Sequence, residues 1–186
     1  DNLLNSPQLG VNETVPGQNN FSYLSAKIDQ HWSSRFRTVL RANVGVVNIA
    51  RQGGGLDGGN AFPSAANFQD RNSALLALQN SYLGEQFKSE TNLQYSRFRW
   101  NYGRAVVLNS PQVSLLDPQE QTIAVLGHPG YVFDATENTL QAQQKLAFYR
   151  DRHSFRTGLE VVSADHSLLG GGNISGNYTV KLTQDQ

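Results

Sequence analysis

The connections between the predicted strands of this chain alternate in length, short and then long. Segments with an alternating apolar pattern are joined by short turns near His31 to Ser34, Gly84 to Gln86 and Arg150 to Ser154. Between them lie long stretches rich in Gly, Pro and Asn, at roughly Ile49 to Asn72, Gly103 to Asn138 and Asp165 to Asn173. A barrel in an outer membrane has tight periplasmic turns and outer loops of almost any length. The alternation therefore predicts an all-β fold: a segment of an antiparallel up-and-down transmembrane β-barrel of about six to seven strands, with short periplasmic turns and long extracellular loops.

Composition is compatible with this fold and excludes several others. The chain has 186 residues, 38% of them apolar and 16% charged, and no window approaches the roughly 20 apolar residues of a membrane helix. Barrel strands escape that test because only alternate residues meet lipid. Fifteen basic residues balance fifteen acidic ones, which argues against a nucleic-acid partner because such a surface needs a basic excess. The absence of Cys excludes disulfides and thiolate metal sites.

The strand segments have one apolar and one charged side. In RFRTVLRANVGVVN, Phe36, Leu40 and Val44 alternate with Arg37 and Arg41, and arginines on one face of a strand cannot enter a dry core without partners. The preceding segment and the hairpin near Arg150 repeat this pattern. We therefore expect a water-filled lumen lined by charged residues: Lys27, Asp29, Arg35, Arg37, Arg41, Lys145, Arg156 and Glu160.

The remaining segments depart from a simple alternation. In QFKSETNLQYSRFRWNY, Phe87 and Tyr95 have one parity while Phe98 and Trp100 have the other. A β-bulge near Ser96 would explain the change of phase, because an extra residue re-aims a strand. The segment NISGNYTV near the C-terminus is a plausible seventh strand.

Aromatic residues gather near both ends of the predicted strands. One group is close to the short turns, at Trp32, Tyr82, Phe87, Phe148, Tyr149 and Phe155. The other is close to the long loops, at Phe21, Tyr23, Phe98, Trp100 and Tyr102. Two such belts, separated by roughly 9 to 11 residues, match the aromatic girdles at the two faces of a bilayer.

Three segments together resemble a known family. They are NNFSYLSAKIDQHWSSRFRTVLRAN, ETNLQYSRFRWNYG and QQKLAFYRDRHSFRTGLEV. Their order is similar to the barrel region of TonB-dependent outer-membrane receptors, especially the Oar-like members with a carboxypeptidase-regulatory-like domain. A basic residue followed by Ile28 and Asp29, a tight turn and an Arg-rich return strand recur there, as does the pattern at Arg152 to Gly158. The resemblance covers Asn19 to Val162, and it differs in showing no plug domain, no TonB box and far fewer strands than the family's 22.

The resemblance implies a function and a place in the cell. Residues 1–186 would be part of the barrel of a receptor in the outer membrane of a Gram-negative bacterium, with its loops extracellular and its plug domain outside this chain. The partners implied are outer-membrane lipid, the plug domain of the same receptor, TonB, and a small-molecule, glycan or peptide ligand. The whole protein would take up a scarce solute, or export one, in the cell envelope.

The sequence indicates no catalytic residues, no metal and no cofactor, and we expect no enzyme activity. Acidic residues lie at turns and loops without a repeated spacing, and the four His residues are dispersed. The Gly-rich stretch Gln52 to Asn60 lacks the strand-to-helix context of a phosphate-binding loop. Aromatic residues of the long loops suit stacking on a sugar or peptide, so we expect ligand-binding residues at Asp57, Trp100, Tyr102, Tyr131 and Phe133.

Two other classes of protein remain open at this point. A small self-contained outer-membrane barrel, acting as an adhesin or structural protein, would use the same strands and needs an even strand count. A soluble β-sandwich binding module would instead pack its apolar faces against each other and keep its charged faces outside. Loops of more than 20 residues at one end disfavour the sandwich.

Overall fold

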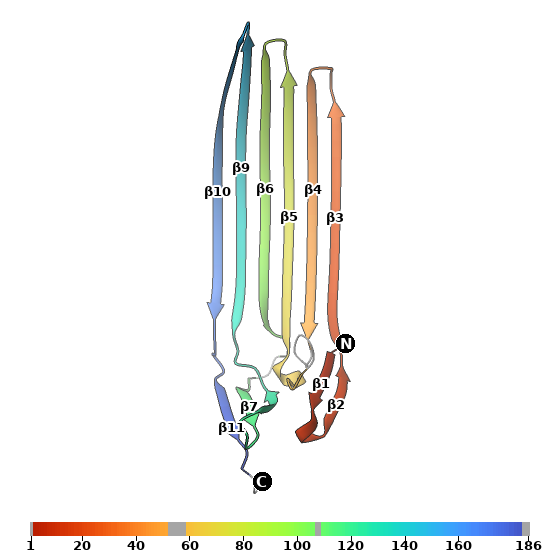
Figure 1. Cartoon of the computed structure of the whole chain (residues 1–186), viewed down its shortest axis with the longest axis vertical. Helices are drawn as coiled ribbons and strands as arrows, with labels where there is room; N and C mark the ends of the chain where they lie inside the picture. Colours follow the sequence, from red (N-terminus) through yellow and green to blue (C-terminus); the bar gives the residue numbers. More distant parts are fainter. Residues whose placement is uncertain (1, 52–58, 107–108, 184–186) are drawn as a thin grey trace.

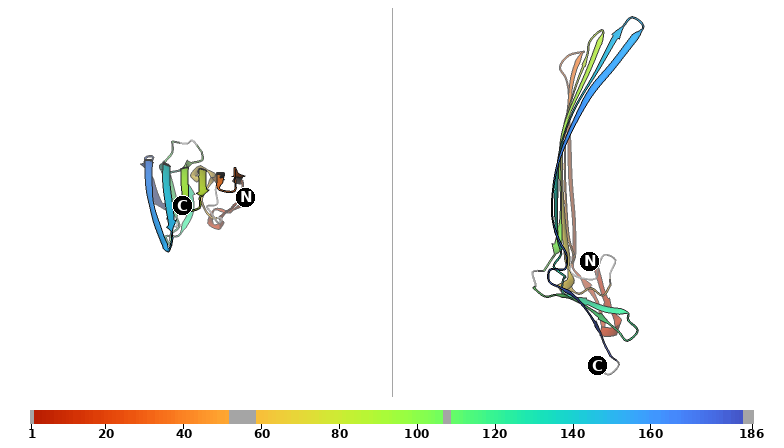
Figure 2. Two further views of the ribbon diagram at one scale, coloured as in Figure 1. Left: turned by 90° about the horizontal axis from the view of Figure 1, so that it is seen from above. Right: turned by 90° about the vertical axis from the view of Figure 1, so that its left-hand side faces the viewer.

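The protein is an all-β chain, built mainly from one long antiparallel sheet. The computed structural model describes residues 2–51, 59–106 and 109–183. Six strands of 15–19 residues form the sheet in the order β10-β9-β6-β5-β4-β3. Their bounds are β3 Gly17–His31, β4 Phe36–Arg51, β5 Asn67–Leu83, β6 Phe87–Arg104, β9 Val132–Arg150 and β10 His153–Gly171. Figure 1 shows them side by side as three hairpins, and Figure 2 shows that the sheet is bent and twisted along its length.

The three short turns predicted from the sequence are confirmed, and all lie at one end of the sheet (Figure 1). At the first, the backbone N–H of Trp32 donates to the carbonyl of Phe36 over 3.0 Å. The hydroxyl of Ser33 accepts from two more backbone N–H groups. Only two residues separate β9 from β10, and Asp151 adopts a φ of 53° there, a conformation that Asp tolerates in tight turns.

The long connections are shorter than predicted and carry structure of their own. The strands run several residues into each expected loop, because β4 continues to Arg51 and β10 to Gly171. Two small sheets lie beyond the other end of the long sheet, away from the short turns (Figures 1 and 2). One joins β1 (Asn2–Ser6) to β2 (Val11–Val15), and the other has the order β11-β7-β8. The remaining elements are β7 Gln112–Leu116, β8 Thr122–Leu126, β11 Asn177–Lys181 and the 3₁₀ turns η1 Pro7–Leu9 and η2 Pro63–Ala65.

The prediction that a seventh strand joins the barrel sheet is wrong. The segment forms β11, but β11 pairs in parallel with β7 and takes no part in the long sheet. The chain leaves β6 and β10 at the same end of the long sheet (Figure 1). Because β7 follows β6 and β11 follows β10, the two short strands can run in the same direction.

Most of the buried apolar residues in the described part of the chain lie in the loop region, while the long sheet contributes Val39 and Ala147. Leu4, Val15, Ala65, Ala66, Ile123 and Ala124 are all at most 8% exposed. Backbone hydrogen bonds tie these segments together, including Phe62 to the carbonyl of Val125 at 2.9 Å. The long connections therefore form a packed cap at one end of the sheet.

The pairing register divides the long sheet into two faces. One continuous row reads Ile28, Leu40, Leu78, Leu93, Ala142 and Val161, and its neighbour on the other side reads Lys27, Arg41, Ala77, Gln94, Gln141 and Val162. We call the side of Leu40 the apolar face and the side of Arg41 the charged face. The faces predicted from the sequence for β3, β4, β9 and β10 are confirmed by these rows.

The bulge predicted near Ser96 is absent. β6 pairs with β5 and with β9 without a register shift from Phe87 to Tyr102. The aromatic residues of β6 therefore change from one face of the sheet to the other along the strand, and Phe98, Trp100 and Tyr102 lie on the charged face with Lys88. The apolar face of β6 in turn carries Arg97 and Arg99 near the loops.

The apolar face is strongly exposed. Leu24 is 68% exposed, Ile28 62%, Leu140 56% and Leu159 70%. No second sheet or helix covers this face within the described ranges. Among those residues, the structure contains no helix long and apolar enough to cross a membrane. An apolar surface of this extent is unusual in water and marks contact with a partner or a lipid phase.

One polar row crosses the apolar face close to the short turns, and its side chains bond to one another. The hydroxyl of Thr38 donates to the amide oxygen of Asn80 over 2.7 Å, and the hydroxyl of Thr91 donates to that of Gln144 over 2.6 Å. The indole N–H of Trp32 donates to Thr38 over 3.0 Å. Because these side chains bond to one another, removing the row from water costs far less free energy than removing unpaired polar groups would.

Candidate functional site

The charged face is the candidate functional surface. Seven of the eight predicted lumen residues lie on it: Lys27, Asp29, Arg37, Arg41, Lys145, Arg156 and Glu160. The eighth, Arg35, lies in the first short turn, where its guanidinium pairs with Glu85 at 2.9 Å. The structure thus gathers these charges on one surface, and their contact with a lumen stays a prediction.

Near the first hairpin turn the charges form a network around Asp29. The Arg37 Nε donates to its carboxylate over 2.7 Å and a second guanidinium nitrogen contacts the other oxygen, so the pair is bidentate. Lys27 Nζ lies 3.4 Å and His31 Nε2 3.7 Å from the same carboxylate. Such forked pairs fix geometry as well as charge. The network therefore links β3 to β4 at the end where the strands turn.

At the other end, the charged face carries an aromatic cluster of Trp100, Tyr102, Tyr131 and Phe133. These are four of the five residues predicted to bind ligand, and the structure brings them together. Tyr102 stacks on Phe133 with ring centroids 4.9 Å apart, and Trp100 meets Phe133 at 5.2 Å. Tyr131 meets Tyr102 edge-on at 5.5 Å. The fifth residue, Asp57, lies outside the described residues.

The second aromatic girdle predicted from the sequence is wrong. Phe21, Tyr23, Phe98, Trp100 and Tyr102 do lie near the loops, but the register places them on the charged face, opposite the apolar one. Their position along the strands agrees with the prediction, but their face of the sheet does not. By contrast, Phe87, Phe148 and Phe155 form one row on the apolar face near the short turns, with Tyr149 on the other side.

The aromatic cluster rests on a hydrogen-bonded base that the sequence did not reveal. His128 is 3% exposed, and its Nδ1 accepts the N–H of Gly130 over 2.9 Å. Its Nε2 therefore carries the proton and donates to the side-chain oxygen of Asn67 over 2.9 Å. The hydroxyl of Tyr131 donates to the same oxygen. Burial lowers the pKa of His128, with a further contribution from the positive charge of Arg104, and burial raises the pKa of Tyr131.

Two polar features give the cluster a binding character. The guanidinium carbon of Arg71 lies 4.8 Å from the ring centroid of Trp100, a cation–π geometry. The buried indole N–H of Trp100 has no hydrogen-bond partner among the described atoms. Stacked rings next to a free donor and a cation can hold a flat or ring-shaped ligand that carries oxygen atoms.

Sequence reasoning missed the supporting residues because they lie far apart in the chain. Asn67 and His128 are 61 positions apart, and Arg71 reaches Trp100 only through the β5–β6 pairing. In the described part of the chain, no group of three or more His, Cys, Asp or Glu residues is placed to hold a metal ion.

Comparisons with known proteins give no relative. No protein-family model matches this chain, and neither does any curated protein or solved structure.

Proposed function

We propose that this chain forms part of the wall of an outer-membrane β-barrel, in a receptor of the TonB-dependent, Oar-like type. The observation that carries the proposal is the exposed apolar face on strands of 15–19 residues, backed by a charged face. In a barrel wall, lipid covers the first and a wet lumen meets the second.

The dimensions of the apolar face support this. On β6, Arg97 is the first charged residue on the apolar face, and it lies ten positions after Phe87 of the aromatic row. At about 3.3 Å per residue this is about 33 Å along the strand. A strand tilt of about 40° reduces it to a height of about 25 Å, the height of the apolar band of such barrels.

Within this proposal, the partners follow from the two faces. The apolar face contacts outer-membrane lipid, while the charged face lines the lumen that holds the plug domain on which TonB acts. The aromatic cluster lies at the extracellular end and contacts a small-molecule, glycan or peptide ligand during uptake or export. Further strands close the barrel, because the six strands described are fewer than the eight of the smallest such barrels.

Fractionation of cells that express the protein tests the proposal. We expect it in the outer-membrane fraction and, on gels, a mobility that differs between unheated and boiled samples, because a folded barrel resists unfolding by detergent. Recovery as a monomer that stays soluble without detergent would contradict the proposal, since the apolar face would then be stable in water.

A further inference from the structure

The charged face has a positive excess that the composition of the chain hides. On the described side chains of the six long strands, eight Lys and Arg residues face this side against four Asp and Glu residues, an excess of four. The cations are Lys27, Arg37, Arg41, Arg71, Lys88, Arg104, Lys145 and Arg156, and the carboxylates are Asp29, Glu90, Glu137 and Glu160. Because the chain as a whole is neutral, the rest of the chain carries the balancing negative charge.

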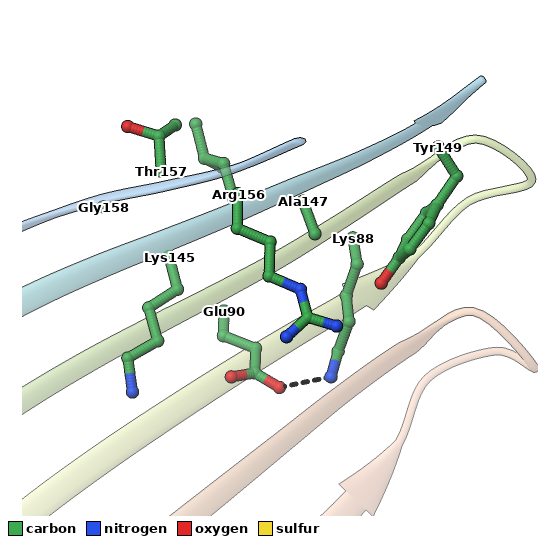
Figure 3. A pocket seen from close by; sticks show the side chains of 9 residues that line it. Lys88, Glu90, Lys145, Ala147, Tyr149, Arg156, Thr157 and Gly158 are labelled. Atoms are coloured by element: carbon green, nitrogen blue, oxygen red, sulfur yellow. Dashed lines mark ion pairs between the residues drawn. The ribbon is translucent and has the colours of Figure 1, made fainter. Parts of the chain in front are cut away.

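Part of this excess surrounds a hollow of about 520 Å³ close to the short turns (Figure 3). The hollow exists because two small residues lie between large ones. Ala147 and Gly158 occupy neighbouring positions on β9 and β10, and the longer side chains of Lys88, Lys145 and Arg156 rise around them. Gly158 is also required by the backbone, since a Cβ there would lie 2.9 Å from the carbonyl oxygen of Gln144.

The hollow contains three cations and one carboxylate. Lys88 Nζ lies 2.7 Å from the carboxylate of Glu90, so this carboxylate is already paired with a cation. Lys145 and Arg156 have no ion pair or hydrogen bond to another side chain in the described part of the chain. Figure 3 shows the guanidinium of Arg156 directed toward Lys88 and Glu90, with Tyr149 beside them. Two cations left without a partner in a concave site favour an anionic occupant.

We propose that this hollow binds the oxyanion group, phosphate or carboxylate, of a small acidic solute. The guanidinium of Arg156 offers paired donors suited to such a group, and Lys145 adds a point charge. Describing the solute as one that passes through a lumen rests on the proposed function, whereas the binding itself does not.

Titration calorimetry on the complete protein in detergent, at constant ionic strength, tests the site with inorganic phosphate and with succinate. We expect at least one of these two anions to bind. Comparing their affinities shows whether the site prefers phosphate or carboxylate. The double variant K145Q/R156Q should weaken binding about tenfold or more. The variant A147L fills the hollow without changing charge and should weaken binding to a similar degree. E90Q removes the competing carboxylate and should tighten it.

The matched control is R41Q, which removes one cation from the same face, three strands away from β9. It should change the dissociation constant by less than about twofold, because exposed charges beyond a Debye length of about 8–10 Å are largely screened. Absence of binding by both anions, or equal weakening by R41Q, would overturn the site. Fractionation reports separately on the proposed function, so an outer-membrane protein that binds no anion refutes only this inference.

Discussion

At the scale of single residues, neighbouring positions on β4 should differ in how much a change of charge destabilises the protein. Leu40 lies in the fully apolar row, so Leu40→Arg should destabilise the protein by about 2 to 4 kcal/mol, the cost of arginine near the midplane of a barrel. Arg41→Leu should cost about 1 kcal/mol or less, because it replaces an exposed cation that has no side-chain partner among the described residues. Urea titration of the complete barrel in lipid vesicles compares the two. Equal penalties would mean that the faces are wrongly assigned.

His128 gives a second residue-scale prediction, for acid pH. Its pKa is lowered below the ordinary value of 6.5 because the ring is buried. The folded state therefore binds a proton less readily than the unfolded state. The contribution of neutral His128 to the stability of the fold is complete above about pH 6.5, and it is lost as the pH falls toward the lowered pKa.

Protonation of Nδ1 would remove the hydrogen bond from Gly130 and loosen the aromatic cluster. In a W32F variant of the 186-residue chain, Trp100 is the only tryptophan left, and its fluorescence should change between pH 7 and 5. His128→Gln should abolish the change, while His166→Gln, at an exposed position, should leave it intact. A change that persists in His128→Gln would show that another group titrates.

At the scale of elements, the sequence determined more of the sheet than of the cap. The six strands, their turns and the phase of Leu40 against Arg41 follow from a two-residue period and turn residues, which are local signals. The cap depends on contacts such as Asn67 with His128, which no local pattern encodes. The four clustered rings could be predicted because they are aromatic residues at the long loops. The hollow around Ala147 could not, because Lys88 and Glu90 come from a strand distant in sequence.

The arrangement of turns and loops predicts sidedness. All three short turns lie at one end of the sheet and the cap at the other. An epitope inserted after Gln119, in the exposed turn between β7 and β8, should be labelled on intact cells. One inserted at Ser33 should be labelled only after permeabilisation. The reverse pattern would place the cap in the periplasm and invert the topology.

At the scale of the whole molecule, the long sheet has two open edges in the part of the chain that the structure describes. β3 and β10 each pair on one side only within the described residues, so alternate N–H and C=O groups along both strands point outward without a partner. In a bilayer each such group would cost several kcal/mol. The two edges run in opposite directions, so an even number of further strands can join them in a closed antiparallel barrel.

Hydrogen exchange of the complete protein in outer membranes tests this closure. If further strands cover both edges, the amides of β3 and β10 should exchange within about tenfold of the rates of β5 and β6, which are paired on both sides. Peptides from the turns at Ser33 and Asp151 should exchange quickly and provide the internal reference. Exchange in β3 and β10 as fast as in those turns would show that the edges meet water. A sheet with wet edges cannot be the wall of a membrane barrel, and the exposed apolar face would then need a protein partner instead of lipid.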